Sequence, residues 1–80
     1  MPYITEAARA RINAGEQPEN SGQLTYKFYK AGLEYVGHKG TSFQAYCDVV
    51  GALFCTALEL YRTQVAPYED IKKEQNGDVT

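Results

Sequence analysis

The sequence predicts an all-α fold, a helical hairpin with a short helix at each end, that assembles into an oligomer. Apolar residues recur at helical spacing in two long segments, near 21–36 and 41–66, and segments containing Gly or Pro bound them. The chain has 80 residues, so residues 1–80 are expected to form one small domain, and its net charge is −2. A domain of this size buries only about 60–65% of its unfolded surface and commonly gains stability from disulfides, metals or oligomerisation.

The first helix is expected from Thr5 to Ala14. Thr5 is a suitable N-cap, Glu6 complements the positive end of the helix dipole, and Gly15 favours termination. Residues 15–22 contain Gly, Pro, Asn and Ser and predict a loop.

The second helix is expected from Ser21 to about Val36. Its polar strip is narrow and consists of Lys27, Lys30 and Glu34. Apolar residues form two further stripes, which are Leu24, Phe28, Ala31 and Tyr35 on one side and Tyr26, Tyr29, Leu33 and Val36 on the other. The helix therefore offers apolar surface to more than one neighbour.

The third helix is expected from Thr41 to Ala66, after a connection over residues 37–40. Thr41 and Gln44 match a capping box. The apolar arc covers roughly half of the helix, more than the arc of about 100° that a surface helix needs. Its central stripe is Phe43, Val50, Phe54, Ala57 and Tyr61.

Pro67 lacks the N–H that a continuing helix would use, so the helix is expected to end or kink there. A short fourth helix then follows from Pro67 to Gln75. Asn76-Gly77 ends it, and residues 78–80 form a tail.

The wide apolar arc implies a partner subunit, because other ways to stabilise the chain are missing. Cys47 and Cys55 lie about 12 Å apart along one predicted helix, too far for a disulfide, so both are expected to be reduced and buried. His38 is the only histidine and no Cys-x-x-Cys pair occurs, so we expect no metal and no cofactor. The expected partner is a second copy of the chain.

The first candidate site is the Gly-His-Lys-Gly-Thr-Ser stretch over residues 37–42. Backbone amides of a tight turn, the charge of Lys39, and the hydroxyls of Thr41 and Ser42 would suit a phosphate or carboxylate. The simpler interpretation is a turn between two helices with a good N-cap.

The second candidate site combines cations with aromatic rings. The cations are Arg9, Arg11, Lys27 and Lys30, and the rings are those of Tyr26 and Tyr29. Cations hold phosphates and rings stack on bases, so these residues would line a nucleotide pocket at a subunit seam. The simpler interpretation gives the cations a solvated face and the tyrosines a packing role.

Enzymatic activity is not expected. Asp48 is the only charge between Phe43 and Leu58, but it falls on the polar side of the helix, where Glu59 and Arg62 are expected to form an ion pair. His38 has no nearby carboxylate–nucleophile pair.

The expected setting is the cytoplasm. The net charge of −2 argues against long nucleic acids as partners, and the N-terminus does not resemble a signal peptide. The run from Phe43 to Leu58 is short for a bilayer and polar on one side, so we expect no membrane partner.

Some segments of the chain carry a family resemblance: Met1-Pro2-Tyr3-Ile4, Gly22-Gln23-Leu24-Thr25-Tyr26, Val50-Gly51-Ala52-Leu53-Phe54-Cys55, Glu59-Leu60-Tyr61-Arg62, Pro67-Tyr68-Glu69-Asp70, Lys72 and Asn76-Gly77-Asp78-Val79. In these segments the chain resembles a family of short uncharacterised proteins from bacteriophages, prophages and environmental sequences. The resemblance implies an acid at Phe54, an arginine at Thr63 and a tyrosine at Thr80, so a polar site built from that acid and arginine would be lost or altered here.

In size, helical layout and implied oligomer the chain also resembles phage anti-CBASS sponges. These small helical oligomers sequester cyclic oligonucleotide signals between subunits. The resulting expectation is a non-enzymatic oligomer, of phage origin, that binds a cyclic oligonucleotide or another small anion at its seams. The alternative is a structural or protein–protein interaction module.

Overall fold

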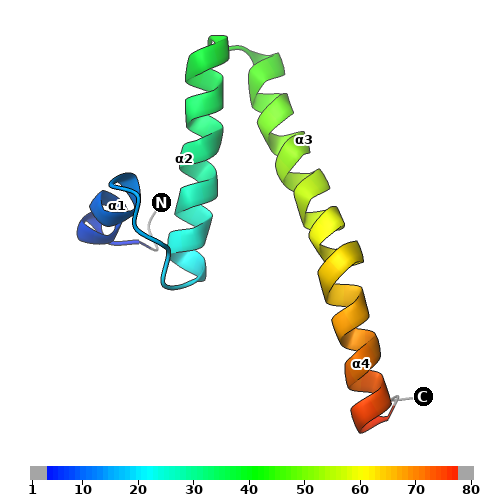
Figure 1. The fold of residues 1–80 in the computed structure, drawn as a ribbon. Coiled ribbons are helices and arrows are strands. Elements are labelled where there is room, and N and C mark those ends of the chain that lie inside the picture. Colours follow the sequence, from blue (N-terminus) through cyan, green and yellow to red (C-terminus); the bar gives the residue numbers. More distant parts are fainter. Residues whose placement is uncertain (1–3, 78–80) are drawn as a thin grey trace. The chain divides into compact units, whose positions relative to one another are not determined.

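A computed structural model describes residues 4–77, which form helices and connecting segments without any strand. The chain divides into two compact units, Met1–Tyr46 and Cys47–Thr80. Figure 1 shows the succession of helices along the chain. The all-α prediction is confirmed, whereas assembly into an oligomer and the packing of the hairpin stay predictions. Residues 1–3 and the expected tail 78–80, with the departure at Thr80, lie outside the described residues.

Helix α1 spans Glu6–Asn13, close to the expected bounds. The Ala8 N–H donates to the Thr5 Oγ1 at 3.1 Å, which confirms Thr5 as the N-cap. Gly15 follows the helix with a φ of 98°, a value that favours glycine. These end signals explain why the sequence predicted this short helix correctly.

Helix α2 spans Ser21–Lys39. At its start the Asn20 side chain accepts from the Gln23 N–H, and the Gln23 side chain accepts from the Glu19 N–H, both at 2.9 Å. The expected end at Val36 was wrong, because residues 37–39 continue the helix. Termination occurs at Gly40, which has a φ of 96° and donates its N–H to the Val36 carbonyl at 2.9 Å.

The core of the first unit lies between α1 and α2. Ile4, Ala8 and Ile12 form a buried cluster with Tyr26 of α2. The Tyr26 hydroxyl donates to the Asn13 Oδ1 at 3.0 Å, which links the end of α1 to α2. In the described chain this small cluster holds α1 against α2 (Figure 1).

Helix α3 spans Phe43–Leu60. Its N-cap is Ser42, whose Oγ accepts from the Ala45 N–H at 3.0 Å. The expected capping box beginning at Thr41 was therefore wrong by one residue. Adjacent hydroxyl residues offer the same side-chain acceptor, so the sequence pattern could not choose between them.

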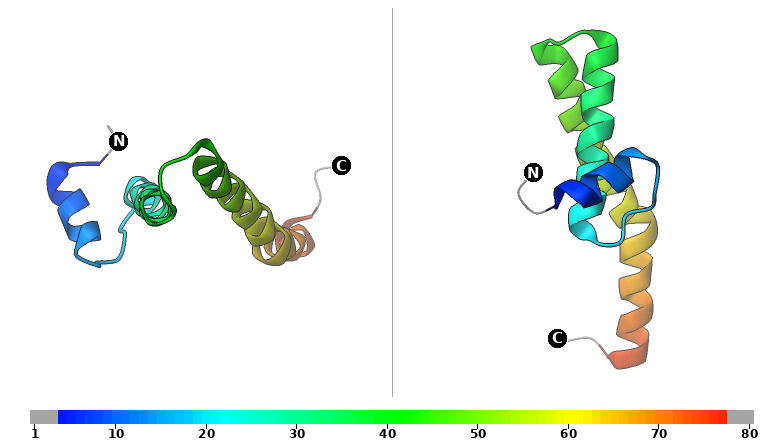
Figure 2. Two further views of the ribbon diagram at one scale, coloured as in Figure 1. Left: turned by 90° about the horizontal axis from the view of Figure 1, so that it is seen from above. Right: turned by 90° about the vertical axis from the view of Figure 1, so that its left-hand side faces the viewer.

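The helix does not break at Pro67. Helix α3 passes into a π-helical segment, η1 (Tyr61–Val65), and then into α4 (Ala66–Asn76), so that one helix runs from Phe43 to Asn76. Figure 2 shows the continuous helical ribbon from two further sides. The Ala66 N–H bonds to the Tyr61 carbonyl in the wider π pattern. The widened turn lies directly before Pro67, where it accommodates the ring and the missing donor.

Helix α4 ends as expected. Gly77 has a φ of 80° and donates its N–H to the Lys73 carbonyl at 2.8 Å. The start at Ala66, one residue before the expected Pro67, places the proline in the first turn of α4.

The apolar face of α3 is exposed in the chain described. Phe43 is 84% exposed, Val50 67% and Phe54 66%, whereas Ala45 is the one buried residue of α3. Cys47 and Cys55 are free thiols, but both are exposed. Their expected burial was therefore wrong for the single chain.

By length and composition, the helix Phe43–Asn76 could cross a membrane. It has 34 residues, and its apolar window has a mean hydropathy of 1.3 with 6% of the window buried. The prediction that residues 43–58 are too short to span a bilayer was based on only part of this continuous helix. Length alone therefore does not argue against a bilayer.

Candidate functional site

An open groove of about 470 Å³ lies between α1 and α2. Its lining residues are Ile12, Asn13, Lys27, Lys30, Ala31 and Glu34. Four of them project from α2 at spacings of three or four residues, so they share one face of that helix. The last turn of α1 supplies the opposite wall. The groove therefore requires α1 to be docked on α2.

The α1 wall is held in place by the core. Ile12 is 8% exposed and belongs to the buried cluster around Tyr26. Asn13 receives the Tyr26 hydroxyl hydrogen bond, so its side chain is fixed on the side that lines the groove. One wall of the groove is thus rigidly connected to the hydrophobic core.

The α2 wall carries two cations and one acid. Lys27 is exposed and Lys30 is half-buried, while Glu34 is exposed. Among the described residues, Lys27, Lys30 and Glu34 form no ion pair with one another, in contrast to Arg62 and Glu59. The two ammonium groups are hydrogen-bond donors for a phosphate or carboxylate, and the Glu34 carboxylate accepts from hydroxyl or amino groups.

The structure separates the other residues of the predicted cation–aromatic site. Tyr26 is 6% exposed, so its ring faces are covered by the core and are not open to a base. Tyr29 is exposed but does not line the groove. Arg9 donates from Nη1 to the Ile4 carbonyl at 2.9 Å, and Arg11 is exposed on α1 outside the groove.

The predicted anion-binding turn over residues 37–42 has a different geometry. Lys39 belongs to the last turn of α2, so the backbone amides before Gly40 take part in that helix. The Ser42 hydroxyl caps α3, and Thr41 is exposed. The expectation of a tight turn with two glycines was wrong, because Gly37 is helical and only Gly40 leaves the helix.

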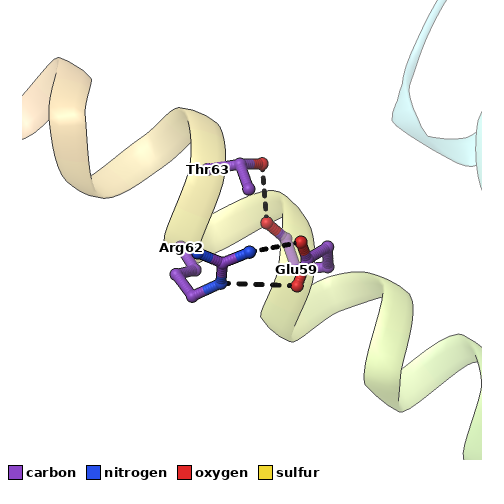
Figure 3. Close-up of polar contacts among 3 residues, drawn as sticks. All are labelled: Glu59, Arg62 and Thr63. Atoms are coloured by element: carbon purple, nitrogen blue, oxygen red, sulfur yellow. Dashed lines mark hydrogen bonds and ion pairs between the residues drawn. The ribbon is translucent and has the colours of Figure 1, made fainter.

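Glu59, Arg62 and Thr63 form a polar cluster at the start of the π segment, as Figure 3 shows. Arg62 contacts Glu59 through two hydrogen bonds, Nη2–Oε1 at 2.6 Å and Nε–Oε2 at 3.4 Å, which confirms the expected ion pair. The Thr63 hydroxyl donates to the Glu59 carbonyl at 2.7 Å. Both charged side chains are largely exposed, so we assign the pair a small effect on stability.

Tyr61 lies in the same segment. A hydrogen bond to Glu69 raises its pKa above the ordinary value of 10.0, and the negative charges of Glu69 and Asp70 act in the same direction. The sequence pattern did not indicate this contact between residues eight positions apart.

A second, smaller groove of about 280 Å³ lies along α4. It is lined by Tyr68, Glu69, Lys72, Lys73, Asn76 and Gly77. The Lys72 Nζ lies 5.6 Å from the centre of the Tyr68 ring and 3.4 Å from the Gln75 Oε1. The Lys72 ammonium therefore already has partners within α4, unlike the lysines of the first groove. In the described part of the chain no group of three or more His, Cys, Asp or Glu residues could hold a metal.

Residues 1–79 match a protein family described as a domain of unknown function (DUF6899). No curated protein and no solved structure matches the chain. The match covers nearly the whole sequence, so the chain belongs to this uncharacterised family. Phage origin and the likeness to sponge proteins stay predictions.

Proposed function

We propose that this chain is a non-enzymatic binding protein that takes a small anionic, nucleotide-like ligand in the groove between α1 and α2. The observation that carries this proposal is the position of Lys27 and Lys30 on one wall of a 470 Å³ groove, with neither lysine in an ion pair. The volume lies within the range of about 300–1,000 Å³ typical of small-molecule sites.

The lining of the groove favours a ligand with both a charge and a polar, planar part. The lysines suit a phosphate, whereas Glu34 suits an amino or hydroxyl group of the same ligand. Ile12 and Ala31 add apolar contact. A cyclic oligonucleotide combines these features. The role that we propose is sequestration of such a ligand in the cytoplasm, which is the host cytoplasm if the protein is phage-encoded.

A thermal-shift panel of cyclic dinucleotides and trinucleotides tests the proposal. A ligand at about 100 times its Kd stabilises the protein by about 2.7 kcal/mol. We expect a shift with the unmodified chain and its loss in the double variant K27Q/K30Q. The matched control K72Q/K73Q removes the same charge from α4 and should keep the shift.

Two results would contradict the proposal. A panel without any shift would exclude this ligand class. A shift that survives K27Q/K30Q but disappears in K72Q/K73Q would place the binding site in the groove along α4 instead.

The second candidate function, a protein–protein interaction module, is favoured by a different observation. Seven large apolar side chains of α3 are each at least 42% exposed: Phe43, Tyr46, Val50, Leu53, Phe54, Leu58 and Leu60. Contiguous apolar surface of this extent is typical of an interaction site. We propose self-association through α3, which is compatible with ligand binding because the groove and α3 use different residues.

A further inference from the structure

We propose that α3 pairs with α3 of a second copy of the chain in antiparallel orientation. The contact surface, which we name the α3 seam, consists of Phe43, Cys47, Val50, Phe54, Ala57 and Tyr61. The proposal rests on the self-association stated above and specifies its partner, its residues and its direction.

The spacing of the seam favours another helix as its partner. Its residues follow one another at alternating steps of four and three, from position 43 to position 61. This 3–4 repeat places them in one stripe along a helix and is the pattern of coiled-coil interfaces. Leu53 and Leu60 lie immediately before two seam positions and widen the stripe on one side. No seam residue carries a formal charge, so two copies of the stripe meet without like-charge repulsion.

The α3 seam and the apolar side chains that flank it together expose enough area for a dimer. The seven exposed side chains of α3, together with Tyr61, are between 42% and 84% exposed. With an aromatic side chain contributing about 150–250 Å², the face amounts to an area on the order of 900 Å² per copy. Stable interfaces bury about 800 Å² on each partner.

The polar side of the helix favours a second copy over a bilayer. Gln44, Asp48 and Glu59 lie on the side opposite the seam. Two paired helices leave these residues in water, whereas a membrane span would bring Asp48 and Glu59 to or near lipid. An acidic residue at the centre of a span costs about 2.5–3.5 kcal/mol.

The distribution of side-chain sizes favours the antiparallel direction. When two copies are related by a twofold axis near Ala52, Val50 faces Phe54, Cys47 faces Ala57, and Phe43 faces Tyr61 of the second copy. A parallel pair would instead set Phe54 against Phe54 beside a layer of two alanines. When large side chains face smaller ones at the centre of the interface, the successive layers of side chains fill space more evenly. Antiparallel helices also place the positive end of one dipole beside the negative end of the other.

Thiol cross-linking of the full chain tests the register. In the antiparallel pair the Cys47 residues of the two copies are ten positions apart, about 15 Å along the axis. They should not react with each other. In the double variant A57C/C55S, the thiol at position 57 faces Cys47 of the second copy, and a short bismaleimide should give covalent dimer as the main product.

Two matched controls accompany this variant. A52C/C55S introduces the same thiol on the opposite side of the helix and should give only background dimer. C55S alone retains only Cys47 and should give background dimer as well. Sedimentation equilibrium at micromolar concentration establishes for each variant whether the chain associates.

The outcomes separate the register from the association itself. Association with efficient cross-linking only in A57C/C55S supports the proposal. Association with cross-linking in C55S alone shows a parallel pair and overturns the antiparallel orientation. Association without cross-linking at either position places the contact elsewhere and overturns the α3 seam. A monomeric chain overturns the seam together with self-association, and binding of the monomer to phosphatidylcholine vesicles would identify a bilayer as the occupant of the face.

Discussion

At the scale of single residues, Tyr26 determines how α1 is attached to α2. Its ring is buried in the cluster with Ile4, Ala8 and Ile12, and its hydroxyl donates to the Asn13 Oδ1 at 3.0 Å. A buried tyrosine with a bonded hydroxyl both packs and orients its neighbours. Because Asn13 also lines the candidate groove, the geometry of the groove depends on this contact.

We expect Tyr26→Phe to destabilise the first unit by about 1 kcal/mol. The substitution keeps the buried ring but removes the hydrogen bond to Asn13. Chemical denaturation monitored by circular dichroism measures the change. Tyr29→Phe is the matched control, since Tyr29 is 48% exposed, and it should leave the stability nearly unchanged. Equal effects of both substitutions would show that the Tyr26 hydroxyl has no structural role.

The residues of the groove were only partly predictable from the sequence. Lys27 and Lys30 were identified because they lie on the narrow polar strip of the second helix. Asn13 and Ile12 could not be assigned, since their role depends on which face of α2 receives α1. Tyr26 was offered both as a stacking and as a packing residue, and its burial agrees with packing. A tyrosine on an amphipathic helix has the same periodicity in a core and in an open site.

At the scale of elements, capping residues and terminal glycines predicted several helix ends, but not every glycine marks an end. Thr5 and Gly77 mark helix ends that the structure confirms. Gly37, in contrast, was interpreted as part of a turn but lies within α2. A glycine inside a helix costs about 1 kcal/mol, which a long packed helix tolerates, so the positive φ of Gly40 decides where α2 ends.

The second point at this scale concerns Pro67, where the sequence predicted either an end or a kink and the helix continues. A proline in a helix removes one hydrogen bond and its ring clashes with the carbonyl four residues earlier, here that of Thr63. The π segment widens the backbone over Tyr61–Val65, and the helix continues. Sequence periodicity assumes one fixed angle per residue, so it could not anticipate this local change.

We expect Pro67→Ala to convert the π segment into regular α-helix and to stabilise the helix Phe43–Asn76. The new N–H can donate to the Thr63 carbonyl, and the gain should not exceed the proline penalty of about 3 kcal/mol. Amide hydrogen exchange over residues 61–67 should slow. Gln64→Ala, which supplies no additional donor, is the control. Unchanged exchange in Pro67→Ala would show that the π segment does not result from the proline.

At the scale of the whole molecule, burial is distributed unevenly. The buried residues of the described chain are Ile4, Ala8, Ile12, Gln23, Tyr26, Val36 and Ala45, all within the first unit. The described residues 47–77 contribute none. The sequence predicted the surplus of apolar surface on the third helix, because periodicity reports the width of a face. It could not identify the covering partner, which is a property of the assembly.

This distribution predicts that the two units respond differently to protein concentration. The contacts of α1 with α2 lie within one chain, so their amide protection should not depend on concentration. Helix α3 lacks buried contacts beyond Ala45, and most helical stability in proteins comes from packing of an apolar face. If α3 pairs with a second copy, its amide protection should decrease on dilution while that of α1 and α2 persists.

Hydrogen exchange at a series of concentrations measures this difference. Phe54→Lys places a charge in the α3 seam. At high protein concentration this variant should show the low amide protection of α3 that the unmodified chain shows on dilution. Ala52→Lys adds the same charge on the opposite side of α3, four residues after Asp48. This variant should keep the amide protection that α3 has at high protein concentration. The prediction would be contradicted if α3 kept the same protection at every concentration, or if both lysine variants lost it equally. Protection of α1 and α2 in all samples provides the internal standard, because the buried cluster around Tyr26 does not involve α3.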